Sequence, residues 1–70
     1  MDYKLLRSLR KSRGLTQDEV ASTIGVSRQA LSNYERGLRE PALKCLIIMA
    51  NMYQVSLDEL VGRKDYQTVN

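Results

Sequence analysis

The residues best suited to specific recognition chemistry lie close together between positions 27 and 36. If this segment is helical, its polar side chains fall within an arc of roughly 140°, and they are Arg28, Gln29, Ser32, Asn33 and Arg36. Arginine can bridge O6 and N7 of guanine, and glutamine or asparagine can bridge N6 and N7 of adenine. The arc holds no carboxylate, because Glu35 lies at its edge, toward the apolar side. This face could read base edges, although an exposed helix face is usually polar in any case.

Other chemistries have little support in the composition. The chain has no histidine, so the usual general base and the commonest metal ligand are missing. The single cysteine, Cys45, cannot form an internal disulfide, and no cluster has metal-ligand spacing. We therefore expect no enzyme activity, no cofactor and no metal. RNA binding is also disfavoured, because only four tyrosines are available for stacking and Tyr34 is expected to be buried.

Length and charge favour one small domain with a polyanionic partner. The chain has 70 residues and a net charge of +3, although many small domains are mildly basic. Its longest apolar run, residues 45–50, is too short to span a bilayer. The N-terminus carries alternating charges where a signal peptide would be apolar. We therefore expect a cytoplasmic protein with no membrane association.

Apolar periodicity predicts five short helices and no strand. The first spans about residues 3–13, capped by Asp2, and the second opens at a Thr16–Glu19 capping box. The third is capped by Ser27 and extends to Arg36. The fourth starts with Pro41 and reaches about residue 53, and the fifth opens at a second capping box, residues 56–59, and ends at Gly62. We expect a domain over residues 1–62 and a loosely ordered tail over 63–70.

The second and third helices should pack against each other across a tight turn at Gly25. Their apolar sides are supplied by Val20, Ala21, Ile24, Val26, Leu31 and Tyr34. In this register the chain resembles the phage repressor and Cro class of helix-turn-helix proteins, the Xre family. The matching stretches are LTQDEVA (15–21), IGVSRQ (24–29), SNYERG (32–37), EPAL (40–43) and VSLDEL (55–60). The resemblance implies an all-α fold, a five-helix bundle of the lambda-repressor-like type with a central helix-turn-helix.

The resemblance also implies roles for individual residues. The helix Ser27–Arg36 would enter the major groove of DNA, with base edges read by Arg28, Gln29 and Asn33, assisted by Ser32. The predicted phosphate contacts are Gln17, Ser27, Arg36, Arg39 and Lys44. Arg10 and Glu35 match a structural ion pair of the family. We expect Arg7, Lys11 and Arg13 to be simply solvated.

The fourth helix departs from the family pattern, because it is apolar nearly all round. Its core stripe is predicted to be Leu43, Leu46, Ala50 and Tyr53. A second apolar stripe of the helix must pack against another surface to be shielded from water. We expect this surface to be a second subunit, with a dimer interface made by Cys45, Ile48, Met52, Leu57 and Val61, and with Ile47 as a neighbour. A bare apolar surface or a docked C-terminal tail is the alternative. In either case Cys45 is expected to be a buried thiol that acts as a small hydrophobe.

These features together predict a sequence-specific transcriptional regulator, in the first instance a repressor. It would bind double-stranded DNA as a homodimer on a pseudopalindromic operator, with its two reading helices about 34 Å apart. The alternative is an antitoxin or another protein-interaction module whose DNA binding is autoregulatory. The apolar fourth helix is the feature that favours such a protein partner.

Overall fold

The computed structural model describes residues 2–62, and this part of the chain consists of five helices without strands. They are α1 (Tyr3–Ser12), α2 (Gln17–Ile24), α3 (Arg28–Glu35), α4 (Leu43–Tyr53) and α5 (Leu57–Val61). The predicted all-α, five-helix fold is therefore confirmed. The tail predicted over residues 63–70 lies outside the described residues. No helix within residues 2–62 is long and apolar enough to cross a membrane.

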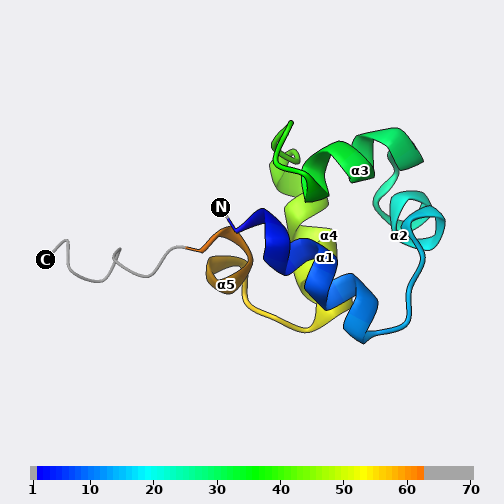
Figure 1. Cartoon of the computed structure of the whole chain (residues 1–70). Helices are drawn as coiled ribbons and strands as arrows, with labels where there is room; N and C mark the ends of the chain where they lie inside the picture. Colours follow the sequence, from blue (N-terminus) through cyan, green and yellow to red (C-terminus); the bar gives the residue numbers. More distant parts are fainter. Residues whose placement is uncertain (1, 63–70) are drawn as a thin grey trace, which may run out of the picture.

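The helices separate into two ends of the molecule (Figure 1). Helices α2 and α3 lie at one end, whereas α5 lies at the other end beside the N-terminus. Helix α3 packs on both α2 and α1, and α4 contacts both α2 and α5. At the far end, a Cβ atom added to Gly62 would lie 3.6 Å from the Asp2 nitrogen. The end of α5 thus closes against the beginning of α1.

Local capping sets the starts of α2 and α5 at the predicted residues. The Thr16 hydroxyl accepts a hydrogen bond from the Glu19 N–H at 3.1 Å, and the Glu19 carboxylate accepts one from the Thr16 N–H at 2.8 Å. Ser56 and Glu59 form the same reciprocal pair at the start of α5. These hydrogen bonds favour the ionised carboxylate, so they lower the pKa of Glu19 and of Glu59. Both capping boxes are confirmed.

The turn between α2 and α3 depends on a left-handed residue. Gly25 has φ +80°, where a side chain would be strained. The Gly25 and Val26 N–H groups both donate to the Ala21 carbonyl, at 2.9 and 3.0 Å. This closes α2 and sends the chain directly into α3, as the glycine position predicts.

The prediction for the start of α4 was wrong. Pro41 is buried but lies outside the helix, which begins at Leu43 with Ala42 as its N-cap. The Ala42 side chain makes no capping hydrogen bond. Proline is compatible with the first helical turn, but it is equally compatible with the extended backbone before a helix. Pro41 thus lies in the segment before the helix, and α4 starts two residues later than predicted.

The predicted faces of α4 also need correction. The buried line of the helix runs through Cys45, Met49 and Tyr53, at a spacing of four residues. Leu43, predicted to be in the core, is 63 % exposed, because it lies about 120° around the helix from Met49. Cys45, predicted at a dimer interface, is only 5 % exposed, and its thiol faces the Ile24 carbonyl at 3.7 Å. Cys45 is thus a buried thiol of the monomer core and cannot meet a second subunit.

The remaining predictions for this region are mixed. Ala50 and Tyr53 are buried as expected, and Leu46 is half-buried against the core. The other predicted interface residues are half-buried, and they are Ile48, Met52, Leu57 and Val61. Ile47 is the residue near the middle of the outward side of α4, and it is 45 % exposed. The apolar surface of α4 is therefore centred on Ile47 and Leu43.

A buried ion pair joins α1 to α3. The Arg10 guanidinium donates to both Glu35 carboxylate oxygens, at 2.8 and 3.1 Å, and to the Leu15 carbonyl at 2.9 Å. Arg10 and Glu35 are each only 7 % exposed. The hydrogen bond to Glu35 raises the pKa of Arg10, against the opposing effect of burial. The predicted structural pair is confirmed.

Tyr53 is the largest fully buried side chain, and its hydroxyl has no hydrogen-bond partner among the described residues. Burial, together with the charge of Glu35, raises the pKa of Tyr53 to about 12. Arg13 lies 5.8 Å from the centre of the Tyr53 ring and donates to the Tyr53 carbonyl. The expectation that Arg13 is simply solvated was therefore wrong, because it joins the end of α1 to the end of α4.

We predict that Glu35→Ala destabilises the fold by about 3–5 kcal/mol, because it leaves the buried Arg10 charge without its partner. The double variant Arg10→Met/Glu35→Leu should recover most of this loss, because it removes both charges. Urea unfolding followed by circular dichroism measures each variant. Equal destabilisation in the single and double variants would contradict this account.

We predict that Tyr53→Phe stabilises the fold by about 1 kcal/mol, because it removes a buried hydroxyl without a partner. Between about pH 10 and pH 12 the unfolded tyrosine ionises while the folded one stays protonated, so ionisation favours unfolding. The stability of the parent should therefore fall more steeply over this range than that of the Phe variant. Urea midpoints measured at about pH 8 and about pH 11 test the difference, and parallel pH profiles would rule it out.

Candidate nucleic-acid interface

Helix α3 has a buried side and an outer side. Leu31, Tyr34 and Glu35 are buried, and they anchor the helix to α1 and α2. On the other side the structure places the residues that the sequence singled out. Arg28, Gln29 and Arg36 are exposed, and Ser32 and Asn33 are half-buried. We call Arg28, Gln29, Ser32 and Asn33 the outer face of α3.

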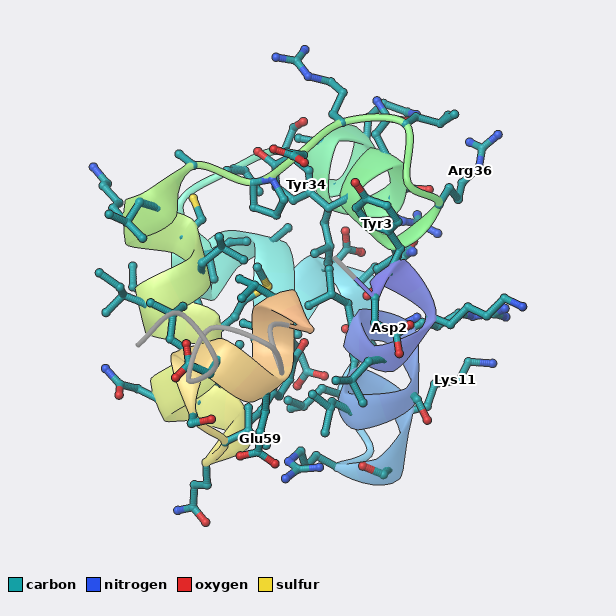
Figure 2. The ribbon with its side chains drawn as sticks, turned by 90° about the vertical axis from the view of Figure 1, so that its left-hand side faces the viewer. Asp2, Tyr3, Lys11, Tyr34, Arg36 and Glu59 are labelled. Atoms are coloured by element: carbon teal, nitrogen blue, oxygen red, sulfur yellow. The ribbon has the colours of Figure 1, made fainter. Side chains whose placement is uncertain are left out.

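A local hydrogen bond fixes the start of α3, and a close contact with α1 follows its end. The Ser27 hydroxyl oxygen accepts a hydrogen bond from the Ala30 N–H at 3.0 Å, so Ser27 is the N-cap and its own hydroxyl hydrogen can still be donated. At the other end, Gly37 has φ +75°, and a Cβ atom placed there would lie 2.8 Å from the Tyr3 ring. In Figure 2, Tyr3 lies beside the end of α3, close to Arg36. Only glycine leaves room for this contact.

Contacts within the outer face are weak and exchangeable. The Gln29 amide donates to the Asn33 side-chain oxygen at 3.2 Å. The Arg28 guanidinium lies 3.9 Å from the Asp18 carboxylate, with the two side chains 68 % and 73 % exposed. An exposed ion pair at this distance contributes little to stability. These side chains can therefore be redirected to another partner at small cost.

The first residue of α2 lies next to the outer face. A hollow of about 240 Å³ is lined by Gln17, Arg28, Gln29 and Ser32. The Gln17 amide donates to Glu35 at 3.1 Å, which fixes its side chain against the buried ion pair. An amide group has two donor hydrogens, so one of them remains for a ligand. The fold thus brings Gln17 together with three residues of the outer face, ten or more positions away in sequence.

The other predicted phosphate contacts follow α3 along the chain. Arg36 is the C-cap of α3, Arg39 lies in the loop that follows, and Lys44 lies in the first turn of α4. All three side chains are exposed. Residues 2–62 contain no group of three or more His, Cys, Asp or Glu side chains placed to hold a metal ion. The side chains predicted to contact DNA carry amides, hydroxyls and cations.

Sequence reasoning missed two cations near this surface. Arg7 and Lys11 of α1, expected to be simply solvated, line a groove together with Arg28, Ser32 and Arg36. Their spacing of four residues places them on one side of α1. That spacing was visible in the sequence, but the packing of α1 against α3 was not.

Comparison with known proteins identifies the same architecture elsewhere. Residues 6–60 match the helix-turn-helix family model. The HTH-type transcriptional regulator ImmR of Bacillus subtilis is 37 % identical over 67 residues, covering 96 % of this chain and 53 % of ImmR. The antitoxin PezA of Streptococcus pneumoniae is 39 % identical over 59 residues, covering 84 % of this chain and 37 % of PezA. This chain thus spans about half of ImmR and a smaller part of PezA.

A solved structure agrees with the fold. The DNA-binding domain of the P22 C2 repressor superimposes with a TM-score of 0.79 at 28 % identity, covering 100 % of this chain and 91 % of that domain. The superposition covers all five helices. The family model, over residues 6–60, spans the turn at Gly25 and the outer face of α3. The chain belongs to the helix-turn-helix family of the Xre type.

Proposed function

We propose that this chain is a sequence-specific DNA-binding regulator of transcription that inserts α3 into the major groove. The observation that carries the proposal is the outer face of α3, where Arg28 and Gln29 are exposed and no carboxylate belongs to the face. The opposite side of α3 is anchored in the core by Leu31 and Tyr34. A rigid helix that presents these side chains matches the donor and acceptor pattern of base pairs in the major groove.

Base reading would begin with a change of partner. Arg28 leaves its exposed, 3.9 Å contact with Asp18 and donates two hydrogen bonds to a guanine. Gln29 and Asn33, which bond each other at 3.2 Å in the free chain, turn to the next base edges. Because both contacts are solvent-exposed, little stability is lost when they break.

Phosphate contacts would position the helix and supply much of the affinity. We assign them to Gln17, Ser27, Arg36, Arg39 and Lys44, which surround the outer face or follow it along the chain. Each cation that meets a phosphate releases counterions, so binding weakens steeply as salt rises. This role needs no cofactor and no catalytic group, in keeping with a sequence that contains no histidine.

We further propose that the regulator acts as a homodimer and represses transcription. A repressor is among its structural neighbours, and an operator-bound dimer would place two copies of α3 about one DNA turn apart. The apolar outward side of α4, centred on Leu43 and Ile47, supplies the contact between subunits. The half-buried Ile48, Met52, Leu57 and Val61 lie at its margin or on the adjoining α5, and Cys45 takes no part.

A second candidate uses the same apolar surface for a different protein. PezA, a relative of part of this chain, is named an antitoxin. In that case DNA binding would be autoregulatory, and the outward side of α4 would meet a partner of another sequence. A complex of stable 1:1 composition with a second protein would favour this candidate over the homodimer.

We predict that Arg28→Ala costs about 1–3 kcal/mol of binding free energy and relaxes the preference at one base position. The measurement is selection of bound sites from random duplex DNA, followed by competition between sites that differ at single bases. Arg39→Gln is the control, because loss of a phosphate contact should weaken all sites equally. Unchanged base discrimination in Arg28→Ala would remove this residue from base reading, and no enriched site in the parent would overturn the proposed function.

We predict that Ile47→Lys shifts the chain from dimer to monomer, because it buries a charge at the proposed interface without a partner. Sedimentation equilibrium measures the mass of the parent and the variant. Ser22→Lys adds the same charge on the exposed side of α2 and should leave the mass unchanged. A parent that is monomeric both alone and on a palindromic site would contradict the homodimer.

A further inference from the structure

A groove of about 810 Å³ lies between three helices, beside the outer face of α3. One wall comes from α1, with Arg7, Arg10 and Lys11, and the floor near α2 comes from residues 15–18. The facing wall is a single row of α3, Arg28, Ser32 and Arg36, spaced by four residues. The groove therefore opens along the edge of the surface that we propose to read bases.

The charges that line this groove do not cancel. Arg10 and Glu35 neutralise each other in a buried pair at 2.8 Å. Arg28 lies opposite Asp18 at 3.9 Å. This leaves Arg7, Lys11 and Arg36 as the lining cations with no opposing carboxylate among the residues of the groove. All three are exposed, with long side chains that can reach a ligand in the groove.

The cations of α1 form a continuous row. Lys4, Arg7 and Lys11 are three and four residues apart, so they share one side of the helix over a length of about 10 Å. An adjoining hollow of about 430 Å³ is lined by the same three residues together with Ser8 and Glu35. In Figure 2, Lys11 of α1 and Arg36 at the end of α3 project toward the same side of the molecule.

We propose that this groove holds the sugar–phosphate backbone of one DNA strand, so that α1 is a second phosphate-binding element. The inference rests on the proposed function, because it places the strand that borders the major groove between α1 and α3. Arg7 and Lys11 contact phosphates from one wall, and Arg36 contacts them from the other. Arg28 and Ser32 belong both to the α3 wall of the groove and to the outer face, so they mark the change from backbone contact to base reading.

The experiment compares Arg7→Gln and Lys11→Gln with Gln54→Glu, a charge-matched control at the exposed end of α4, outside the groove. Each change lowers the net charge by the same amount. The probe is a duplex DNA of mixed sequence, and the binding constant is measured by fluorescence anisotropy over a range of KCl concentrations. Each contact with a phosphate contributes about 0.9 to the slope of log K against log salt.

We expect each groove variant to reduce the salt slope by about 0.9 and to weaken binding about tenfold near 0.1 M salt. The double variant Arg7→Gln/Lys11→Gln should reduce the slope by about 1.8. Site selection should return the same sequence preference as the parent, since these residues contact no base. The Gln54→Glu control should keep the parent slope, and thermal melting should show all variants folded.

Three results would contradict the proposal. Groove variants with the same salt slope and affinity as Gln54→Glu would show that Arg7 and Lys11 are merely solvated. The proposed function would then still stand, provided that the parent and its Arg28→Ala variant differ in base discrimination. A parent that does not bind duplex DNA at all would overturn both the groove and the proposed function. An altered base preference in the Arg7 variant would place that residue at a base and not at the backbone.

Discussion

The arrangement of the molecule depends on one buried ion pair. Arg10 of α1 holds both oxygens of Glu35 on α3, and Gln17 at the start of α2 donates to the same carboxylate. Three helices thus meet at a single charged group that is almost fully excluded from water. A carboxylate in this environment must keep its partners, because an unpaired buried charge is very costly. The orientation of α3 relative to α1 and α2 is therefore set by hydrogen-bond geometry as well as by apolar packing.

This constraint divides α3 into a fixed side and an adaptable side. Leu31, Tyr34 and Glu35 are held by the core, so the helix axis and its rotation are determined before any ligand binds. On the outer face, the contacts of Arg28 with Asp18 and of Gln29 with Asn33 are exposed and easily replaced. A rigid backbone that carries exchangeable side chains lowers the ordering cost of recognition. The same ion pair also draws α1 close to α3, which creates the basic groove between them.

A second contact joins the end of α1 to the end of α4. Tyr53, the last residue of α4, is fully buried, and Arg13 lies over its ring and donates a hydrogen bond to its carbonyl. The Tyr53 hydroxyl finds no partner among the described residues, so the site favours the size of the ring over its polarity. In the first half of α4, Leu43 and Ile47 face outward, and no part of residues 2–62 covers this apolar surface. Helix α3 thus presents polar groups to solvent, whereas α4 presents an apolar surface.

The sequence by itself determined the features that depend on neighbouring residues. Both capping boxes, the glycine turn at residue 25 and the inward and outward sides of α3 follow from hydrogen bonds and periodicity within a few positions. The motif spacing also pointed to the family, and the resemblance implied the Arg10–Glu35 pair. Only the tertiary structure decided the rotation of α4, because a helix that is apolar nearly all round carries no periodic signal to choose its buried side. In the folded chain this rotation buries Cys45 and exposes Leu43. The packing of α1 against α3, which local patterns do not encode, places Arg7 and Lys11 beside α3.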